Sequence, residues 1–314
     1  MDQNEVGVPM FRITLEWFVL WRKLIGCAFS GWSYICCTAS DCTEKSFKSF
    51  SCINAVHNRA MRYFLGVGKY TPNTALAGEM AWRPPIVRQW KTIALSWSRL
   101  SCSFQSRVNK RIALWANHKS GNTCKICFFY VKKQFSDCNS AHYCCLDKQL
   151  PKRTLVDDIV KKLTSNYVSE WKTALCRVES VSGRGRNKLR TYTNFKEEFT
   201  LEQYCCMILF PLHRAAFCKF RCGVAPIRIE TGRYERKCHF CNNVEDEGHV
   251  LFNCHLYEDI RLELIEKATI LETNFTNWSD LEKLKLVYTK STLIRLVAKT
   301  CYTIWKRRMF YICR

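Results

Sequence analysis

Four residues in the carboxy-terminal third have the types and spacing of a metal site. Cys238, Cys241, His249 and Cys254 follow one another as C-x2-C-x7-H-x4-C. Thiolate sulfur and imidazole nitrogen are donors that zinc prefers, and two cysteines separated by two residues fit one tight turn. Four protein donors leave no open position on a tetrahedral ion. We therefore expect a structural zinc, which stabilises the fold rather than activating water.

A second set of cysteines and a histidine has related spacing, C-x2-C-x10-C-x3-H. It consists of Cys124, Cys127, Cys138 and His142, with Cys144 and Cys145 as rival fourth donors. The chain has 21 cysteines, so a cysteine-rich surface loop is the favoured interpretation of this spacing, and a second metal site is the alternative. Both interpretations stay open at this point.

Catalytic patterns are missing from the sequence. Two-metal phosphoryl transfer needs carboxylates that share divalent ions, and Asp157 and Asp158 are the only adjacent aspartates. They lie near the start of a predicted helix, where carboxylates complement the helix dipole without any catalytic role. The chain has no G-x4-G-K-[ST] loop, G-x-S-x-G elbow or H-E-x-x-H helix. The sequence therefore predicts a protein that is not an enzyme.

The charge of the chain favours a polyanionic partner. Its 314 residues include 49 lysines and arginines against 27 aspartates and glutamates, a formal net charge of +22. The excess is concentrated in residues 51–150, which carry fifteen basic and three acidic residues. A solvated protein surface normally mixes both signs. We therefore expect nucleic acid as the partner, with a solvated basic face as the alternative.

A membrane location is not expected. The most apolar segment, residues 17–37, is interrupted by Arg22 and Lys23 and is then too short to span a bilayer. Acidic residues precede it and no small-residue cleavage pattern follows it, so it is not a signal peptide. The cysteines are then interpreted as reduced thiols or metal ligands, which predicts an intracellular protein, in the nucleus or the cytoplasm.

Apolar residues recur at helical spacing along most of the chain, which predicts a mainly α fold. Trp90 and Trp97 belong to an apolar stripe on a helix that begins at Pro85. Other helices are expected over residues 52–66, 154–165, 195–222, 255–271, 279–289 and 291–311. Thr154 is the expected cap of the helix over 154–165. Between them, residues 182–190 contain two glycines and four cations and predict a linker.

Three blocks of sequence resemble non-LTR (LINE-type) retrotransposon reverse transcriptases. The first is VHNRAMRYFLGV at 56–67, with TPN at 71–73, GEMAW at 78–82 and Pro84. It is similar to the region just after the polymerase palm. The second is GRG at 183–185, with NKLRTY at 187–192 and FK at 195–196, and it resembles the linker of that family. The third is IETGRY at 229–234 followed by the metal-site residues and EDE at 245–247, and it resembles the carboxy-terminal zinc knuckle.

This resemblance implies a helical thumb that holds template and primer, followed by a cysteine and histidine domain that engages RNA or DNA. The polymerase and endonuclease carboxylates of the family have no counterpart in this sequence. The predicted organisation is an unassigned segment 1–50, a basic thumb-like region 51–177, a linker 178–194, and a helical domain 195–314 with the knuckle at 238–254. The alternatives are a protein-interaction module, favoured by the acidic loop at 245–247, and an inactive transposon remnant.

The expected phosphate contacts form two groups of cations. In the thumb-like region they are Arg59, Arg62, Arg88 and Lys91. Near the knuckle they are Arg184, Arg186, Lys188, Arg190, Arg233, Arg236 and Lys237. The three acidic residues at 245–247 are expected to make their own side of the knuckle repel phosphate.

Overall fold

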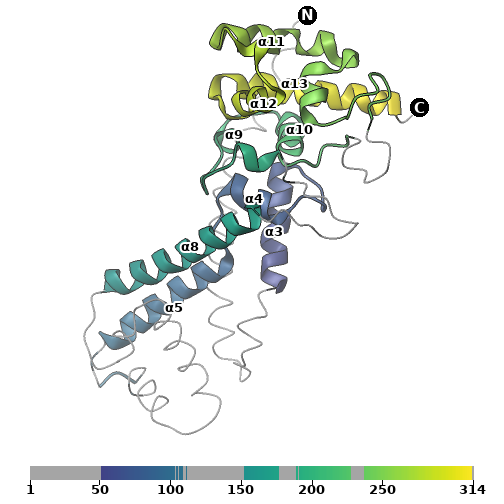
Figure 1. Ribbon diagram of the computed structural model, residues 1–314. Helices are drawn as coiled ribbons and strands as arrows, with labels where there is room; N and C mark the ends of the chain where they lie inside the picture. The colour runs from purple at the N-terminus through teal and green to yellow at the C-terminus, as the bar shows by residue number, and fades with distance from the viewer. Residues whose placement is uncertain are drawn as a thin grey trace, which may run out of the picture. The chain divides into compact units, whose positions relative to one another are not determined.

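Helices account for most of the residues that the computed structural model describes (Figure 1). The described residues are 51–102, 104, 106–108, 111, 152–176, 189, 191–227 and 237–312. Their α-helices are α3 (Ser51–Leu65), α4 (Asn73–Met80), α5 (Pro85–Ser101), α8 (Lys152–Cys176), α9 (Gln203–Cys206), α10 (Pro211–Arg221), α11 (Glu258–Leu271), α12 (Asp280–Thr289) and α13 (Ser291–Ile312). The prediction of a mainly α fold is confirmed.

The chain divides into two compact units. Residues up to 57 and 83–169 belong to the first unit, and residues 58–82 and 170–314 belong to the second. The sequence-based limits, which keep 51–177 together, do not anticipate that 58–82 belong with the carboxy-terminal part. The described end of the expected linker is also packed, because Leu189, Thr191 and Tyr192 are buried in the second unit.

In the first unit, Trp90 and Trp97 of α5 are buried as predicted. Val87 and Ala94 are buried on the same helix. Helix α8 begins at Lys152 and continues to Cys176, beyond the range 154–165 that the periodicity indicates. Thr154 therefore lies inside the helix, and its expected role as a cap is wrong.

The second unit is built around α13, which contacts α10, α11 and α12 (Figure 1). The three neighbours pack against a face of α13 where Val297, Ala298 and Ile304 are fully buried. These residues recur at helical spacing, so one stripe supplies the central contact of the unit. The helices predicted over 255–271, 279–289 and 291–311 are confirmed, although residues 255–257 form a 3-10 turn and α11 begins at Glu258.

The continuous helix expected over 195–222 is interrupted. Only the four residues of α9 and the later helix α10 are α-helical in this range. Phe210, with ψ 134°, is extended because the ring of Pro211 disfavours helical geometry in the preceding residue. Pro211 then occupies the first turn of α10, where its missing N–H group costs nothing.

Gly78 of α4 makes a close packing contact possible within the second unit. A Cβ atom at this position would lie 2.5 Å from the hydroxyl oxygen of Tyr192 and 2.8 Å from the ring of Trp171. The Tyr192 hydroxyl donates to the carbonyl of Ala75 at 3.3 Å, and the indole of Trp171 donates to that of Thr74 at 2.9 Å. Helix α4 is thus joined to the carboxy-terminal part of α8 and to the turn at 192–194.

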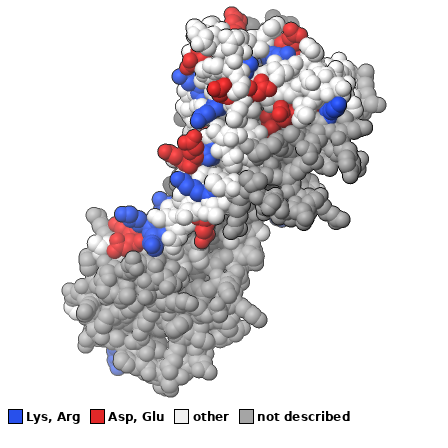
Figure 2. Space-filling model, viewed as in Figure 1, with Lys and Arg blue, Asp and Glu red and all other residues white. Residues whose placement is uncertain are grey.

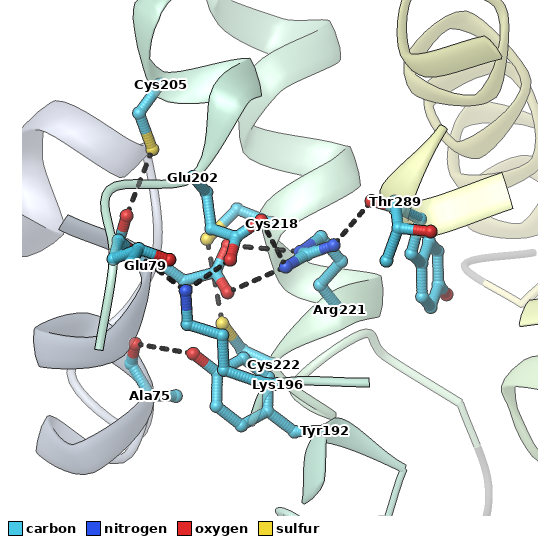
Figure 3. A network of polar contacts seen from close by, with 12 residues as sticks. Ala75, Glu79, Tyr192, Lys196, Glu202, Cys205, Cys218, Arg221, Cys222 and Thr289 are labelled. Carbon is cyan, nitrogen blue, oxygen red and sulfur yellow. Dashed lines mark hydrogen bonds and ion pairs between the residues drawn. The ribbon is translucent and has the colours of Figure 1, made fainter. Parts of the chain in front are cut away.

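A buried cluster of charges joins α4 to α10 in the second unit (Figure 3). The guanidinium of Arg221, 1% exposed, donates from Nε and Nη2 to the two carboxylate oxygens of Glu79, each at 3.1 Å. Its Nη2 also lies 2.9 Å from Glu202, and its Nη1 donates to the carbonyl of Tyr288 at 2.6 Å. Glu202 in turn accepts from the ammonium of Lys196.

The charges of this cluster compensate one another. Burial alone lowers the pKa of Arg221, but the carboxylates of Glu79 and Glu202 outweigh burial and raise the pKa well above its usual range. The guanidinium also lies against aromatic rings, with the ring centre of Phe195 at 4.6 Å. Every partner is supplied by the protein, so the cluster is a structural connection between helices.

Candidate metal centre

The backbone of residues 237–244 forms the tight turn that brings the first two cysteines together. Cys238 donates its N–H to the carbonyl of Asn243 at 2.7 Å, and Asn242 donates back to the carbonyl of Cys238 at 3.0 Å. Asn242 has φ 56°, a left-handed conformation that asparagine tolerates better than most residues. Lys237 and Val244 form a short antiparallel bridge that closes the turn.

The other two predicted ligands lie at the two ends of a single turn of π-helix, His249–Asn253. Cys254 donates its N–H to the carbonyl of His249 at 2.8 Å, which returns the chain toward the histidine. Asp246 accepts from the backbone N–H of His249 at 2.8 Å and holds the start of the turn. The sequence interval x4 between His249 and Cys254 thus becomes a short distance in space.

All four predicted ligands converge. The ligand atoms of Cys238, Cys241, His249 and Cys254 lie within 4.8 Å of one another. The Sγ atom of Cys254 is 3.8 Å from that of Cys238 and 3.7 Å from that of Cys241. Metal–sulfur bonds of about 2.3 Å in a tetrahedron separate two sulfurs by about 3.8 Å. The cluster has the donors and the spacing to hold a metal ion.

One polar atom at the site is unsatisfied by the described part of the protein. Nε2 of His249 is buried and has no hydrogen-bond partner. Burial raises the pKa of the Cys254 thiol to about 12, and burial also lowers the pKa of His249. A bound dication would supply the missing partner of Nε2 and favour the thiolate form of the cysteines.

The acidic residues between the ligands are not the exposed, phosphate-repelling loop that the sequence suggests. Glu245, 1% exposed, forms a buried ion pair with Arg308 of α13. Glu247, also 1% exposed, accepts from the hydroxyl of Thr191 at 3.0 Å. This expectation is corrected, because these carboxylates attach the metal-binding segment to its neighbours instead of facing a partner.

Two further arginines attach the segment after the last ligand to the helices. Arg261 of α11 donates to the carbonyl of Cys254 at 2.8 Å. Arg307 of α13 donates to the carbonyl of Leu256 at 3.0 Å and forms an ion pair with Asp259. The metal-binding segment is therefore connected to the helices through both carboxylates and carbonyls.

The predicted phosphate contacts fall into three kinds of environment. Arg59, Lys91 and Lys237 are exposed, and Arg88 is half-buried. Arg62 is half-buried and donates to the carbonyl of Thr71 at 3.1 Å and to the side chain of Asn73 at 2.6 Å, so we assign it the role of holding the loop after α3. The remaining predicted phosphate contacts lie outside the described residues; they are Arg184, Arg186, Lys188, Arg190, Arg233 and Arg236. The second set of potential metal ligands also lies outside the described residues; it consists of Cys124, Cys127, Cys138, His142, Cys144 and Cys145.

Aromatic residues beside the metal centre were not among the predicted contacts. Phe240, between the first two cysteines, is 49% exposed, and its ring centre lies 5.9 Å from that of Tyr311, which is 51% exposed. The sequence could have indicated Phe240 as a candidate contact, because it lies between the two cysteines of C-x2-C. Tyr311 is distant in sequence, and only the packing of α13 brings it close.

Comparisons of the chain with protein-family models, with curated proteins and with solved structures find no match. The resemblance to non-LTR reverse transcriptases therefore stays a hypothesis based on the quoted residues. Among the helices that the structure describes, none has the length and apolar character needed to cross a membrane.

Proposed function

We propose that this chain binds nucleic acid through basic surfaces that a structural zinc orders. The proposed origin is the non-catalytic carboxy-terminal part of a non-LTR-type reverse transcriptase. The observation that carries the proposal is the convergence of four ligands at the turn over 237–244, where Lys237 and Phe240 are exposed and Phe240 lies beside Tyr311. Zinc knuckles use such exposed aromatic and basic groups to contact unpaired bases and phosphates.

Zinc is the metal that the donor set fits best. Three thiols and one imidazole suit a borderline-soft ion with tetrahedral geometry, whereas calcium and magnesium prefer oxygen donors. When bound, zinc supplies a closed tetrahedral connection and no reactive position. The chain itself then orients the turn at 237–244 and keeps it attached to α13 through Glu245 and Arg308.

The charge balance supports a polyanionic partner over a basic protein partner. The net charge is +22, and Glu245 and Glu247 are withdrawn from the surface. The argument for a protein-interaction module depended on the acidic loop being exposed, so we do not carry that alternative forward. The lack of catalytic motifs is consistent with a binding role, with Asp157 and Asp158 exposed on α8.

The test is the affinity of the zinc-loaded full chain for a fluorescently labelled 20-nucleotide RNA, measured by anisotropy across a salt series. Changing Arg184, Arg186, Lys188 and Arg190 to glutamine should weaken binding and reduce the slope of log K against log[salt] by up to about three. The matched control changes four exposed lysines to glutamine: Lys172, Lys267, Lys285 and Lys290.

A smaller loss in the control than in the test variant supports a localised interface. Equal losses in the two variants indicate attraction by net charge alone and contradict the proposed contacts. No binding by the unmodified chain at low salt overturns the nucleic-acid function and favours an inactive remnant.

A further inference from the structure

A row of aromatic rings extends from the start of α10 to α13. Ring centres are separated by 5.6 Å between Phe210 and His213, by 5.1 Å between His213 and Tyr302, and by 6.3 Å between Tyr302 and Trp305. We call these four residues the aromatic row. Phe210 is 61% exposed and the other three are half-buried, so the row reaches the surface.

The rings of the aromatic row differ from the core rings of the same unit. Tyr204, Phe217 and Tyr288 are fully buried. In the row, by contrast, Phe210 is exposed and His213, Tyr302 and Trp305 are only half-buried. Solvent-accessible ring surface therefore remains available to a planar ligand.

Cations accompany the aromatic row. Lys219 of α10 places its Nζ 3.9 Å from the ring centre of Trp305. On α13, Arg295, Lys299 and Lys306 are exposed, and their spacing puts them on the same face of the helix as Tyr302. Lys299 lies 3.8 Å from Glu263, whereas Arg295 and Lys306 have no acidic partner within the described part of the chain.

Charge is segregated between the helices of this unit. Helices α10 and α13 together contain eight lysines and arginines and no acidic residue, and six of the eight are exposed or half-buried because only Arg221 and Arg308 are buried. Helices α11 and α12 contain four basic and six acidic residues. Figure 2 shows one face of the molecule, on which described acidic and basic side chains lie side by side. The α10 and α13 helices, with no acidic residue of their own, offer a polyanion a more uniform surface.

We propose that the aromatic row and its cations form a binding surface for single-stranded nucleic acid. Unpaired bases stack on Phe210, Tyr302 and Trp305, while phosphates contact Lys219, Arg295 and Lys306. A single strand fits because its bases expose their faces, whereas the bases of a duplex are already stacked on one another. This assignment deepens the proposed function and depends on it, but it concerns helices α10 and α13 rather than the metal-binding turn.

The experiment compares the zinc-loaded full chain with variants of the row, using anisotropy with a single-stranded RNA, the DNA of the same sequence, and the RNA duplex. Phe210→Ala and Tyr302→Ala should each weaken single-strand binding about 5- to 100-fold with an unchanged salt slope. Arg295→Gln with Lys306→Gln should instead reduce the slope by about 1.4. The RNA and DNA arms report whether the 2′-hydroxyl contributes.

Matched controls separate a local effect from loss of folding. Leu262→Ala and Ile270→Ala remove exposed apolar side chains of α11, which are 61% and 74% exposed, and should leave affinity unchanged. Tyr302→Phe retains the ring and should retain binding. Far-ultraviolet circular dichroism and metal content of each variant confirm that the unit is intact.

The outcomes separate a failure of this binding surface from a failure of the proposed function. If the unmodified chain binds RNA but the row variants bind equally well, the aromatic row is not the binding surface and the function survives. If the duplex binds as tightly as the single strand, or if a polyglutamate peptide competes as well as the oligonucleotide, stacking of unpaired bases is wrong. If nothing binds at low salt, the function itself fails.

Discussion

The cluster around Arg221 and the metal centre at 238–254 connect helices of the same unit by different means. Arg221 donates to Glu79, Glu202 and a backbone carbonyl, so its charge is compensated by the protein alone. At the metal centre, Nε2 of His249 is buried without a partner. The charges of the first site are compensated within the folded chain, whereas the second site has the donors to hold a metal ion.

A third buried group is the imidazole of His57 in the first unit. Burial, with a smaller contribution from Arg88, lowers its pKa from 6.5 to about 4. His57 is therefore neutral at pH 7 in the folded chain. The three sites bury polar groups in different ways, as a cluster of potential metal ligands, as ion pairs and as a neutral imidazole, and we expect each to respond to a different perturbation.

The largest effect should come from removing a metal ligand. Cys238→Ser leaves three donors, and we expect loss of bound zinc and destabilisation of the second unit by about 5 kcal/mol or more. Chemical denaturation followed by circular dichroism, together with metal analysis, measures both. Cys206→Ser changes an exposed cysteine and serves as the control. Full stability and helicity in a zinc-free Cys238→Ser chain would show that the centre is not structural.

Breaking the charge cluster should have the next largest effect. Arg221→Met leaves the carboxylate of Glu79 buried without its partner and should cost about 3–5 kcal/mol. The double variant, Glu79→Met with Arg221→Met, should lose less than the single variant because no unpaired charge remains. Denaturant titrations of both variants, each with zinc bound, provide the measurement. A double variant that is less stable than Arg221→Met would contradict this account of the cluster.

The smallest effect should be the acid sensitivity that His57 contributes. Its folded pKa is depressed, so the unfolded state binds the proton first and stability falls as the pH drops from 6.5 toward 4. The full loss is about 3 kcal/mol, reached below pH 4. Because acid also affects the metal ligands, the informative quantity is the difference between the unmodified chain and His57→Gln. Parallel pH profiles for the two chains would rule out this role of His57.

Much of the local architecture is predictable because it depends on short-range rules. Gly66 ends α3, Pro85 begins α5, and the periodic segments at 279–289 and 291–311 form α12 and α13. The metal-site residues could be predicted because both ligand pairs are close in sequence and each pair is brought together by a single turn. The break at Pro211 follows from proline chemistry that the apolar periodicity of 195–222 obscures.

The long-range features could not be predicted from the sequence. Glu79 and Arg221 are 142 residues apart, and no local pattern indicates that they pair. The acidic run at 245–247 resembles an exposed loop until α13 supplies Arg308. Similarly, the aromatic row combines residues of α10 and α13 that share a face only after the helices pack.

The most direct test of the account removes the metal while following structure and binding together. The zinc-loaded full chain, with labelled single-stranded RNA bound, is titrated with a chelator while circular dichroism and anisotropy are recorded. We predict that helicity and RNA affinity fall together as zinc is lost, and that both return when zinc is restored. RNA affinity that is unchanged after complete loss of zinc would contradict the claim that the metal centre orders the binding surface.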